Sequence, residues 1–264
     1  MADYLNEALF GLYPYAAITV FLVGSLLRFD AAQYTWRSGS SQLLRRRLLR
    51  TGSNLFHIGI LLLLAGHTVG LLTPPAIYHA LGLTTAAKQV LAMTAGGIFG
   101  TLCFVGLSLL LYRRLFDARI RRTSTPMDIA IVLMIYAQLL LGMATIYFSA
   151  HHPDGETMAA LADWAQRIVT LRGGAAAEIA HVEVVYKLHL VLGMTIFVAF
   201  PFSRLVHIWS APVWFLLRPG YQIVRTRRSK HTAASPTRGP AGGAPSYGGP
   251  TVLRQMAESG QEGA

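Results

Sequence analysis

Residues 187–209 read KLHLVLGMTIFVAFPFSRLVHIW, an apolar stretch with a histidine near each end. His189 and His207 are eighteen residues apart, which in a straight α-helix corresponds to roughly 27 Å and five whole turns. Both imidazoles are therefore expected on the same face of one helix. Because the hydrocarbon core of a bilayer is about 30 Å thick, such a helix would present one histidine near each side of a membrane.

The composition supports a membrane location for the whole chain. Of its 264 residues, 53% are hydrophobic and only 13% are charged, with a mean hydropathy of +0.44, which lies outside the range of soluble domains. We predict an all-α membrane protein, because the apolar runs lack the alternation of a membrane β-strand. Five runs are long enough to form transmembrane helices: residues 10–27, 53–72, 90–112, 127–148 and 184–209.

Lysine and arginine are distributed unevenly between these runs. Nineteen of the 23 fall in residues 28–50, in residues 113–122 or from residue 204 onward, all on one side of the predicted bundle. By the positive-inside rule this side is cytoplasmic, so the N-terminus is expected outside and the C-terminus inside. The net charge of +11 is then a signal of topology, and no nucleic-acid partner is predicted. The basic loop after the first run suits contact with membrane lipid.

The chain divides into a membrane domain and a tail. Residues 1–226 are predicted to form a five-helix membrane domain. Residues 227–264 are rich in Gly, Pro, Ser and Ala, cannot bury a core, and are predicted to be a disordered cytoplasmic tail. Within the long loop on the outer side, the apolar periodicity of residues 158–171 predicts a short surface helix.

Some small and polar residues inside the apolar runs predict helix contacts. The spacing of Gly96 and Gly100 indicates close packing of one helix against another. Tyr136 and Gln138 would be costly against lipid, so we expect both side chains to face the interior of the bundle.

Four histidines at bilayer depth are the main candidates for function, because a histidine in a membrane helix needs a polar partner, a proton pathway or a metal. His57 and His67 lie ten residues apart in the second run, roughly 15 Å of helix, and face broadly one way. The second run leads outward and the fifth inward. His57 is therefore expected beside His207 on the inner side, and His67 beside His189 on the outer side.

Each predicted pair has the composition of a bis-imidazole site. Haem iron takes two opposed imidazoles, and the flat apolar faces of a porphyrin suit a helix bundle, so the pattern predicts two b-type haems. Zinc is an alternative, although a tetrahedral site needs about four ligands together. A proton relay is the alternative without metal. The unequal spacings, roughly 15 Å against roughly 27 Å, require a tilt or a kink, for which Pro201 is the candidate.

Two arginines are candidates for binding the haem propionates on the inner side. Arg204 precedes His207 by three residues and therefore lies on a nearby helix face, whereas Arg114 ends the third run. Simple anchoring of both side chains at the inner membrane surface is the alternative.

Several segments of the chain form a recognisable set: LYPY (12–15), RFDAAQYTWR (28–37), SNLFHIGILLLLAGH (53–67), LLTP (71–74), RRLF (113–116), FSAHHPDG (148–155), WAQRIVTLRGGA (164–175) and KLHLVLGMTIFVAFPFSRLVHIWSAPV (187–213). This set resembles a known family, the membrane cytochrome b subunit, or gamma subunit, of bacterial respiratory nitrate reductase. The resemblance covers roughly residues 1–226 and includes all four histidines at the family's spacing.

The resemblance implies a multi-pass protein of the bacterial cytoplasmic (inner) membrane. By this resemblance, it takes electrons from quinol near the outer face and passes them to an iron–sulfur beta subunit and a molybdenum alpha subunit, where nitrate is reduced. Oxidation of quinol would release protons outside. The resemblance also implies that His67 and His189 hold the outer haem b, that His57 and His207 hold the inner one, and that Lys88 matches the quinol-site lysine. An interfacial snorkelling lysine is the plain alternative for Lys88.

Three hypotheses follow from the sequence. The first is the quinol-oxidising haem anchor of a nitrate reductase. The second is a related haem-b anchor of another reductase, acting on sulfur compounds or a heterodisulfide. The third is a proton-conducting or structural membrane protein without haem.

Overall fold

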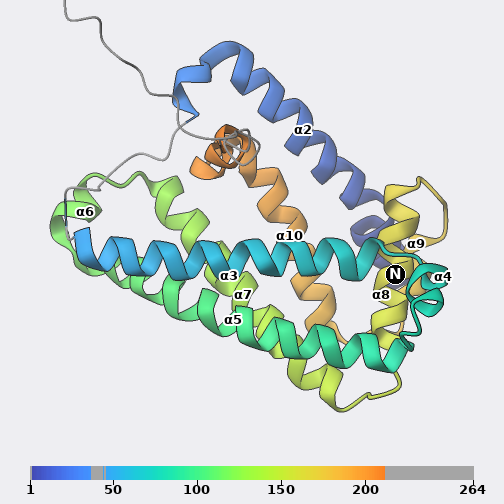
Figure 1. Cartoon of the computed structure of the whole chain (residues 1–264). Coiled ribbons are helices and arrows are strands. Elements are labelled where there is room, and N and C mark those ends of the chain that lie inside the picture. Colours follow the sequence, from blue (N-terminus) through green and yellow to red (C-terminus); the bar gives the residue numbers. More distant parts are fainter. Residues whose placement is uncertain (1, 37–43, 45, 212–264) are drawn as a thin grey trace, which may run out of the picture. The chain divides into compact units, whose positions relative to one another are not determined.

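The computed structural model describes residues 2–36, 44 and 46–211, which are almost entirely helical, with no strand among them (Figure 1). The predicted tail, residues 227–264, lies outside the described part of the chain. The α-helices are α1 (Ala2–Glu7), α2 (Tyr13–Ala32), α3 (Arg46–Leu72), α4 (Pro75–Ala80), α5 (Thr85–Phe116), α6 (Ala118–Arg122), α7 (Pro126–Ala150), α8 (Glu156–Val169), α9 (Ala175–Glu178) and α10 (Val184–Ala199). A π-helix, η1 (Ala8–Leu12), and three 3₁₀ segments, η2 (Gln33–Thr35), η3 (Phe200–Phe202) and η4 (Arg204–Ser210), complete the set.

Five helical segments are long and apolar enough to cross a membrane. They are Asp3–Thr35, Arg46–Leu72, Thr85–Phe116, Pro126–Ala150 and Val184–Phe202. The prediction of an all-α protein with five spanning helices is thus confirmed for the residues described. The first four segments are longer than the apolar runs predicted from the sequence. Their helical backbone hydrogen bonds continue into polar residues at the ends of the runs, and a search for apolar residues leaves these out.

Side-chain caps determine where α5 and α7 begin. The Thr84 hydroxyl accepts a hydrogen bond from the Ala87 amide at 3.2 Å, so α5 starts just before Lys88. At α7, the Asp128 amide donates to the Thr125 hydroxyl and the Thr125 amide donates to the Asp128 carboxylate, which is a capping box. Lys88 and Asp128 therefore each lie in the first turn of a spanning helix.

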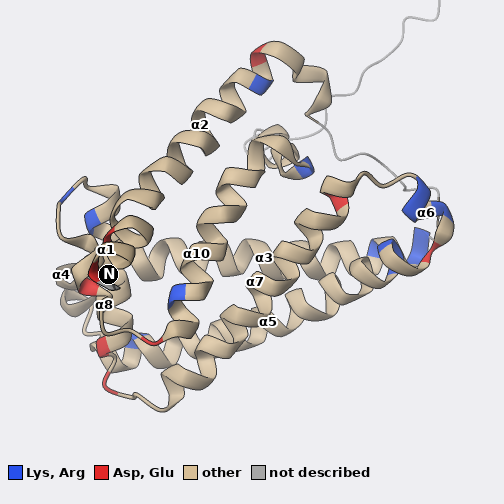
Figure 2. Ribbon diagram, turned by 180° about the vertical axis from the view of Figure 1, so that it is seen from behind, with Lys and Arg blue, Asp and Glu red and all other residues tan. Residues whose placement is uncertain are grey.

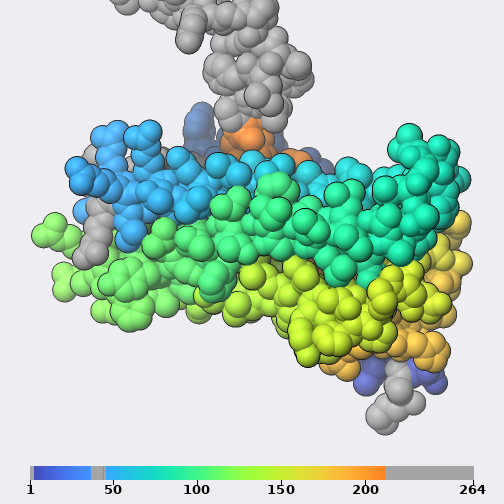
Figure 3. Space-filling model, turned by 60° about the horizontal axis from the view of Figure 1, so that its bottom comes forward, coloured from blue at the N-terminus to red at the C-terminus, as the bar shows by residue number. Residues whose placement is uncertain are grey.

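The helices α3 and α5 lie side by side along their length, with α7 next to α5 (Figure 3). Glycines make this contact close. A Cβ added at Gly59 would lie 2.6 Å from the backbone nitrogen of Cys103, and one added at Gly106 would lie 2.8 Å from the carbonyl oxygen of Gly52. Beyond this pair, α7 packs on α10 and α10 packs on α2.

A small cap packs at the end of the bundle where α3 finishes. Here the Trp164 indole on α8 donates to the Phe10 carbonyl at 2.9 Å, and the Gln166 amide donates to the Leu71 carbonyl at 3.0 Å. Buried side chains of η1, α2, α8, α9 and α10 form one hydrophobic cluster there. The surface helix predicted at residues 158–171 is confirmed as α8, which begins and ends two residues earlier. We call this end of the bundle the α8 end.

The prediction of one continuous helix over residues 184–209 is wrong in its second half. The α-helix α10 ends at Ala199, followed by η3, an extended residue at Ser203 (φ −115°, ψ 179°) and η4. The cause is Pro201, which has no backbone N–H and whose ring clashes with the preceding turn of an α-helix. His207 therefore lies on a separate 3₁₀ segment and not on the helix that carries His189.

Positive charge gathers at the opposite end of the bundle, around α6 (Figure 2). The arginines there are the following: Arg113 and Arg114 at the end of α5, and Arg119, Arg121 and Arg122 on α6. We call this the α6 end.

Candidate functional site

The structure brings the four membrane histidines together as two pairs. His57 and His67 project from α3 and face His207 on η4 and His189 on α10, respectively. The ring centroids of His57 and His207 are 6.4 Å apart, and those of His67 and His189 are 6.2 Å apart. These are the two pairs that the topology predicted. Their role as haem ligands stays a prediction.

The centroid distances of both pairs match a metal ion held between two imidazoles, whereas at His189 the Gln138 amide lies against Nε2 and Nδ1 is buried with no hydrogen-bond partner among the described residues. With metal–nitrogen bonds of about 2 Å, two opposed imidazole rings have centroids about 6.3 Å apart. A porphyrin supplies four ligands of its own, so two histidines complete the coordination of haem iron but fall short of a tetrahedral zinc site. Among residues 2–36, 44 and 46–211, no group of three or more His, Cys, Asp or Glu side chains is placed to hold a metal ion.

Hydrogen bonds to the ring nitrogens orient three of the four histidines. The Nδ1–H groups of these rings donate to backbone carbonyls one turn earlier: His57 to Ser53 at 2.7 Å, His67 to Leu63 at 2.7 Å, and His207 to Arg204 at 2.6 Å. A donor bond at Nδ1 leaves Nε2 as the unprotonated nitrogen, which is the form that binds a metal.

His189 has a different environment, formed by α7. The Gln138 amide nitrogen lies 3.2 Å from His189 Nε2 and donates to the His189 carbonyl at 3.1 Å. A Cβ added at Gly142 would lie 3.0 Å from Cε1 of the same ring. The expectation that Gln138 faces the bundle is therefore confirmed. The same holds for Tyr136, whose hydroxyl lies 3.3 Å from that of Ser108.

The break after α10 changes the expected distance between His189 and His207. Because Ser203 is extended, the roughly 27 Å expected between His189 and His207 on a straight helix no longer applies. The segment η4 that carries His207 contacts Asp128 on α7, Ser25 on α2 and the Trp36 carbonyl. Pro201, predicted to kink the helix, lies at the point where the α-helix stops.

Both predicted propionate-binding arginines converge on Asp128 at the start of α7. Arg204 Nε lies 3.1 Å from Asp128 Oδ1, and Arg114 Nη1 lies 3.7 Å from Asp128 Oδ2. Arg114 also donates to the Ser124 hydroxyl at 3.0 Å. Two arginine side chains of the described residues therefore contact one carboxylate. Asp128 was not among the predicted site residues. It lies far from Arg204 in the sequence, so no local pattern connects the two.

Lys88 is buried near the α8 end, with only 9% of its surface exposed. Its ammonium nitrogen lies 4.2 Å from the centroid of the Tyr78 ring, and Tyr78 is itself buried on α4. A cation over the face of a tyrosine is held in place by the ring quadrupole. The lysine side chain is therefore enclosed by the protein and held against α4.

The comparisons with known proteins extend over most of the chain. The family profile for the nitrate reductase gamma subunit matches residues 6–227. The respiratory nitrate reductase 2 and 1 gamma chains of Escherichia coli (strain K12) are 54% and 53% identical, covering 86% and 85% of this chain and 100% and 99% of their own lengths. The nitrate reductase gamma chain of Bacillus subtilis (strain 168) is 36% identical, over 84% of this chain and 99% of its own.

These matches and the five apolar helices identify a multi-pass membrane protein that is one subunit of an oxidoreductase complex. A gamma chain implies alpha and beta partners. The resemblance noted in the sequence is confirmed: the chain belongs to the nitrate reductase gamma subunit family, the membrane cytochrome b component of respiratory nitrate reductase.

Proposed function

We propose that this chain oxidises quinol near the outer membrane face and delivers the electrons inward to its partner subunits. Two b haems, the outer between His67 and His189 and the inner between His57 and His207, would supply one-electron redox chemistry. The observation that carries the proposal is the pair of ring spacings, 6.2 and 6.4 Å, each of which fits two imidazoles on one iron.

The orientation follows from the charge of the two ends. The arginines around α6 favour the cytoplasmic side by the positive-inside rule (Figure 2). The α8 end, the N-terminus, Lys88 and the His67–His189 pair would then face outside. The C-terminus would be cytoplasmic, in the inner membrane of a bacterium, and the exposed apolar side chains of α3 would contact lipid.

Quinol would bind beside Lys88, close to the outer pair of histidines. The ammonium group, held over Tyr78, can donate a hydrogen bond to a quinol oxygen. Oxidation converts quinol to quinone, two electrons and two protons. The protons leave on the outer side and the electrons move inward, so that turnover transfers charge across the membrane. The iron–sulfur beta and molybdenum alpha subunits would receive the electrons on the cytoplasmic side, and nitrate reduction would occur on the alpha subunit.

Arg114 and Arg204 would hold the propionates of the inner haem. Both guanidinium groups lie at the start of α7 against Asp128, and guanidinium groups donate charged hydrogen bonds to carboxylates such as a propionate. The backbone carbonyl of Arg204 also accepts the Nδ1 hydrogen bond of His207, so the propionate site and the axial ligand belong to one local structure.

The quinol site is tested by replacing Lys88 with methionine. We expect quinol-driven haem reduction to fall by about 10- to 100-fold, because a charged hydrogen bond to the substrate is lost, while dithionite still reduces both haems. Stopped-flow absorbance with a quinol analogue measures the difference. The matched control is Lys187→Met. The Lys187 ammonium group donates to the Ala180 carbonyl and is not part of the proposed quinol site. A Lys88→Met protein as fast as the parent would remove Lys88 from the quinol site.

The outer haem is tested from α7 by the change Gly142→Val. A branched side chain there meets the His189 ring and displaces it, so we expect loss of the outer haem with retention of the inner one. Haem content per chain and the reduced-minus-oxidised spectrum measure the loss. Gly96→Val is the control, because a Cβ at Gly96 would make only an ordinary 3.7 Å contact with Ile146. Loss of neither haem would contradict the assignment of His189.

A further inference from the structure

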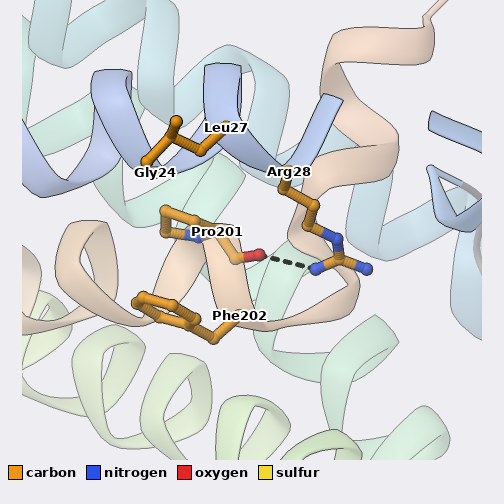
Figure 4. Close-up of a pocket in the computed structure, with 5 residues that line it drawn as sticks. All are labelled: Gly24, Leu27, Arg28, Pro201 and Phe202. Carbon is orange, nitrogen blue, oxygen red and sulfur yellow. Dashed lines mark hydrogen bonds between the residues drawn. The ribbon is translucent and has the colours of Figure 1, made fainter. Parts of the chain in front are cut away.

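A single arginine joins α2 to the broken end of the last spanning segment (Figure 4). Arg28 Nη1 donates to the carbonyl oxygen of Pro201 at 2.6 Å and to that of Ser203 at 2.8 Å. On its other side, Arg28 Nε donates to the Thr35 hydroxyl at 3.2 Å. The guanidinium on α2 therefore bridges Thr35 of η2, Pro201 of η3 and Ser203, the residue between η3 and η4.

The Pro201 carbonyl needs a donor because the helix is interrupted. In a continuous α-helix the Pro201 carbonyl would accept from the Leu205 amide, but that amide donates instead to the Ser203 hydroxyl at 3.2 Å. Unpaired backbone carbonyls are costly at membrane depth. Arg28 supplies the donor that the Pro201 carbonyl lacks, and the same nitrogen also donates to the Ser203 carbonyl at the start of η4.

Other contacts tie the same segment to α2. A Cβ at Gly24 would lie 2.8 Å from Pro201 Cγ, so the two backbones can approach closely only because residue 24 is glycine. At the far end of η4, the Trp209 indole donates to the Ser25 hydroxyl at 3.4 Å, and the Ser210 hydroxyl donates to the Trp36 carbonyl at 3.1 Å. The 3₁₀ segment is thus anchored before and after His207.

We propose that Arg28 is a positioning residue for His207, which sets the orientation of this imidazole at the inner haem by pairing the carbonyls of Pro201 and Ser203. The inference rests on the proposed function, because it takes His207 as an axial ligand. His207 has no α-helix of its own to hold it. Its ring bonds to the Arg204 carbonyl within η4, so a shift of η4 carries the imidazole with it.

The test compares Arg28→Met, Arg28→Lys and Gly24→Ala in the intact nitrate reductase complex. The readouts are the midpoint potential of each haem and its low-spin ferric resonance signal, whose shape depends on the angle between the two imidazole planes. We expect a shift in the signal and potential of the inner haem in all three variants, largest in Arg28→Met. The outer haem is an internal control for folding and should be unchanged.

The variants Arg28→Lys and Gly24→Ala distinguish an effect of the position of η4 from an effect of the positive charge of residue 28. Arg28→Lys keeps the charge but cannot reproduce the planar set of donors, and Gly24→Ala keeps Arg28 while pressing a methyl group against Pro201. An exposed arginine at the α6 end, in the variant Arg121→Gln, should leave both haems unchanged.

Three outcomes would overturn the inference. The first is an inner haem that is unaltered in Arg28→Lys and Gly24→Ala. Any effect of Arg28→Met would then come from the lost charge and not from the position of η4. The second is an equal change in both haems, which would indicate a general structural role. The third is a parent complex without haem, which would refute the proposed function itself and the inference with it.

Discussion

Replacing His67 with alanine is expected to remove the outer haem and to lower quinol-dependent nitrate reduction by more than about a hundredfold. His67 is the α3 member of the outer pair, 6.2 Å from His189 between ring centroids. Under the proposed function, the outer haem would lose one of its two histidines and quinol would lose its electron acceptor. The inner haem should remain reducible by dithionite, because the proposed His57–His207 pair is unchanged.

The matched control for this change is His181→Ala. His181 is exposed and precedes α10, so its loss should alter neither haem content nor turnover. Pyridine haemochrome quantitation and nitrate reduction driven by a quinol analogue measure the two effects. If His67→Ala kept both haems, the paired-histidine assignment would be wrong at the outer site.

Replacing Gly106 with leucine is expected to have the largest effect on stability. A Cβ there would approach the backbone nitrogen of Phe56 and would lie 2.8 Å from the Gly52 carbonyl oxygen. Backbone atoms of a spanning helix cannot move aside as a flexible side chain can, so α3 must separate from α5. We expect a cost of about 3 kcal/mol or more and loss of both haems, because α3 carries one ligand of each pair.

Gly97→Leu is the control for this change on the same helix. A Cβ at Gly97 meets nothing within 4 Å in the described structure, so the added side chain should be accommodated. Thermal unfolding in detergent and the amount of haem-loaded protein in membranes report the difference. Equal stability of the two variants would show that the close contact between α3 and α5 does not hold the bundle together.

The spanning helices and the histidine pairs could be predicted from the sequence because both depend on local pattern. Length and hydropathy identify an apolar helix, and alternating directions of successive helices bring His57 to the level of His207 and His67 to the level of His189. No detailed packing is needed for either step. The additional length of the helices depends on hydrogen bonding through polar turns, which hydropathy does not detect.

The interruption at Pro201 was predicted only as a kink. Hydropathy remains high on both sides of the proline, so the apolar run gave no signal that the α-helix stops at Ala199. What decides the conformation is the missing N–H of Pro201 together with a donor from another helix. Arg28 lies far away in sequence, and the sequence alone does not show that it pairs the carbonyls of Pro201 and Ser203.

The same limit applies to the glycines. The spacing of Gly96 and Gly100 predicted close packing, but a Cβ at either position would make only ordinary contacts, at 3.7 and 3.6 Å, with side chains of α7. The close approach occurs instead at Gly59 and Gly106, where backbone meets backbone. Which glycine faces which helix depends on the rotation of each helix about its axis, and a motif of small residues does not specify that rotation.

The most direct test of the central claim is a potentiometric titration of the haem spectrum in four single variants, His57→Ala, His67→Ala, His189→Ala and His207→Ala. The claim is that the histidines act as two pairs, one near each side of the membrane. We predict that His67→Ala and His189→Ala lose the same haem component, and that His57→Ala and His207→Ala lose the other. Loss of different components within a pair, or a parent protein without haem, would contradict the account.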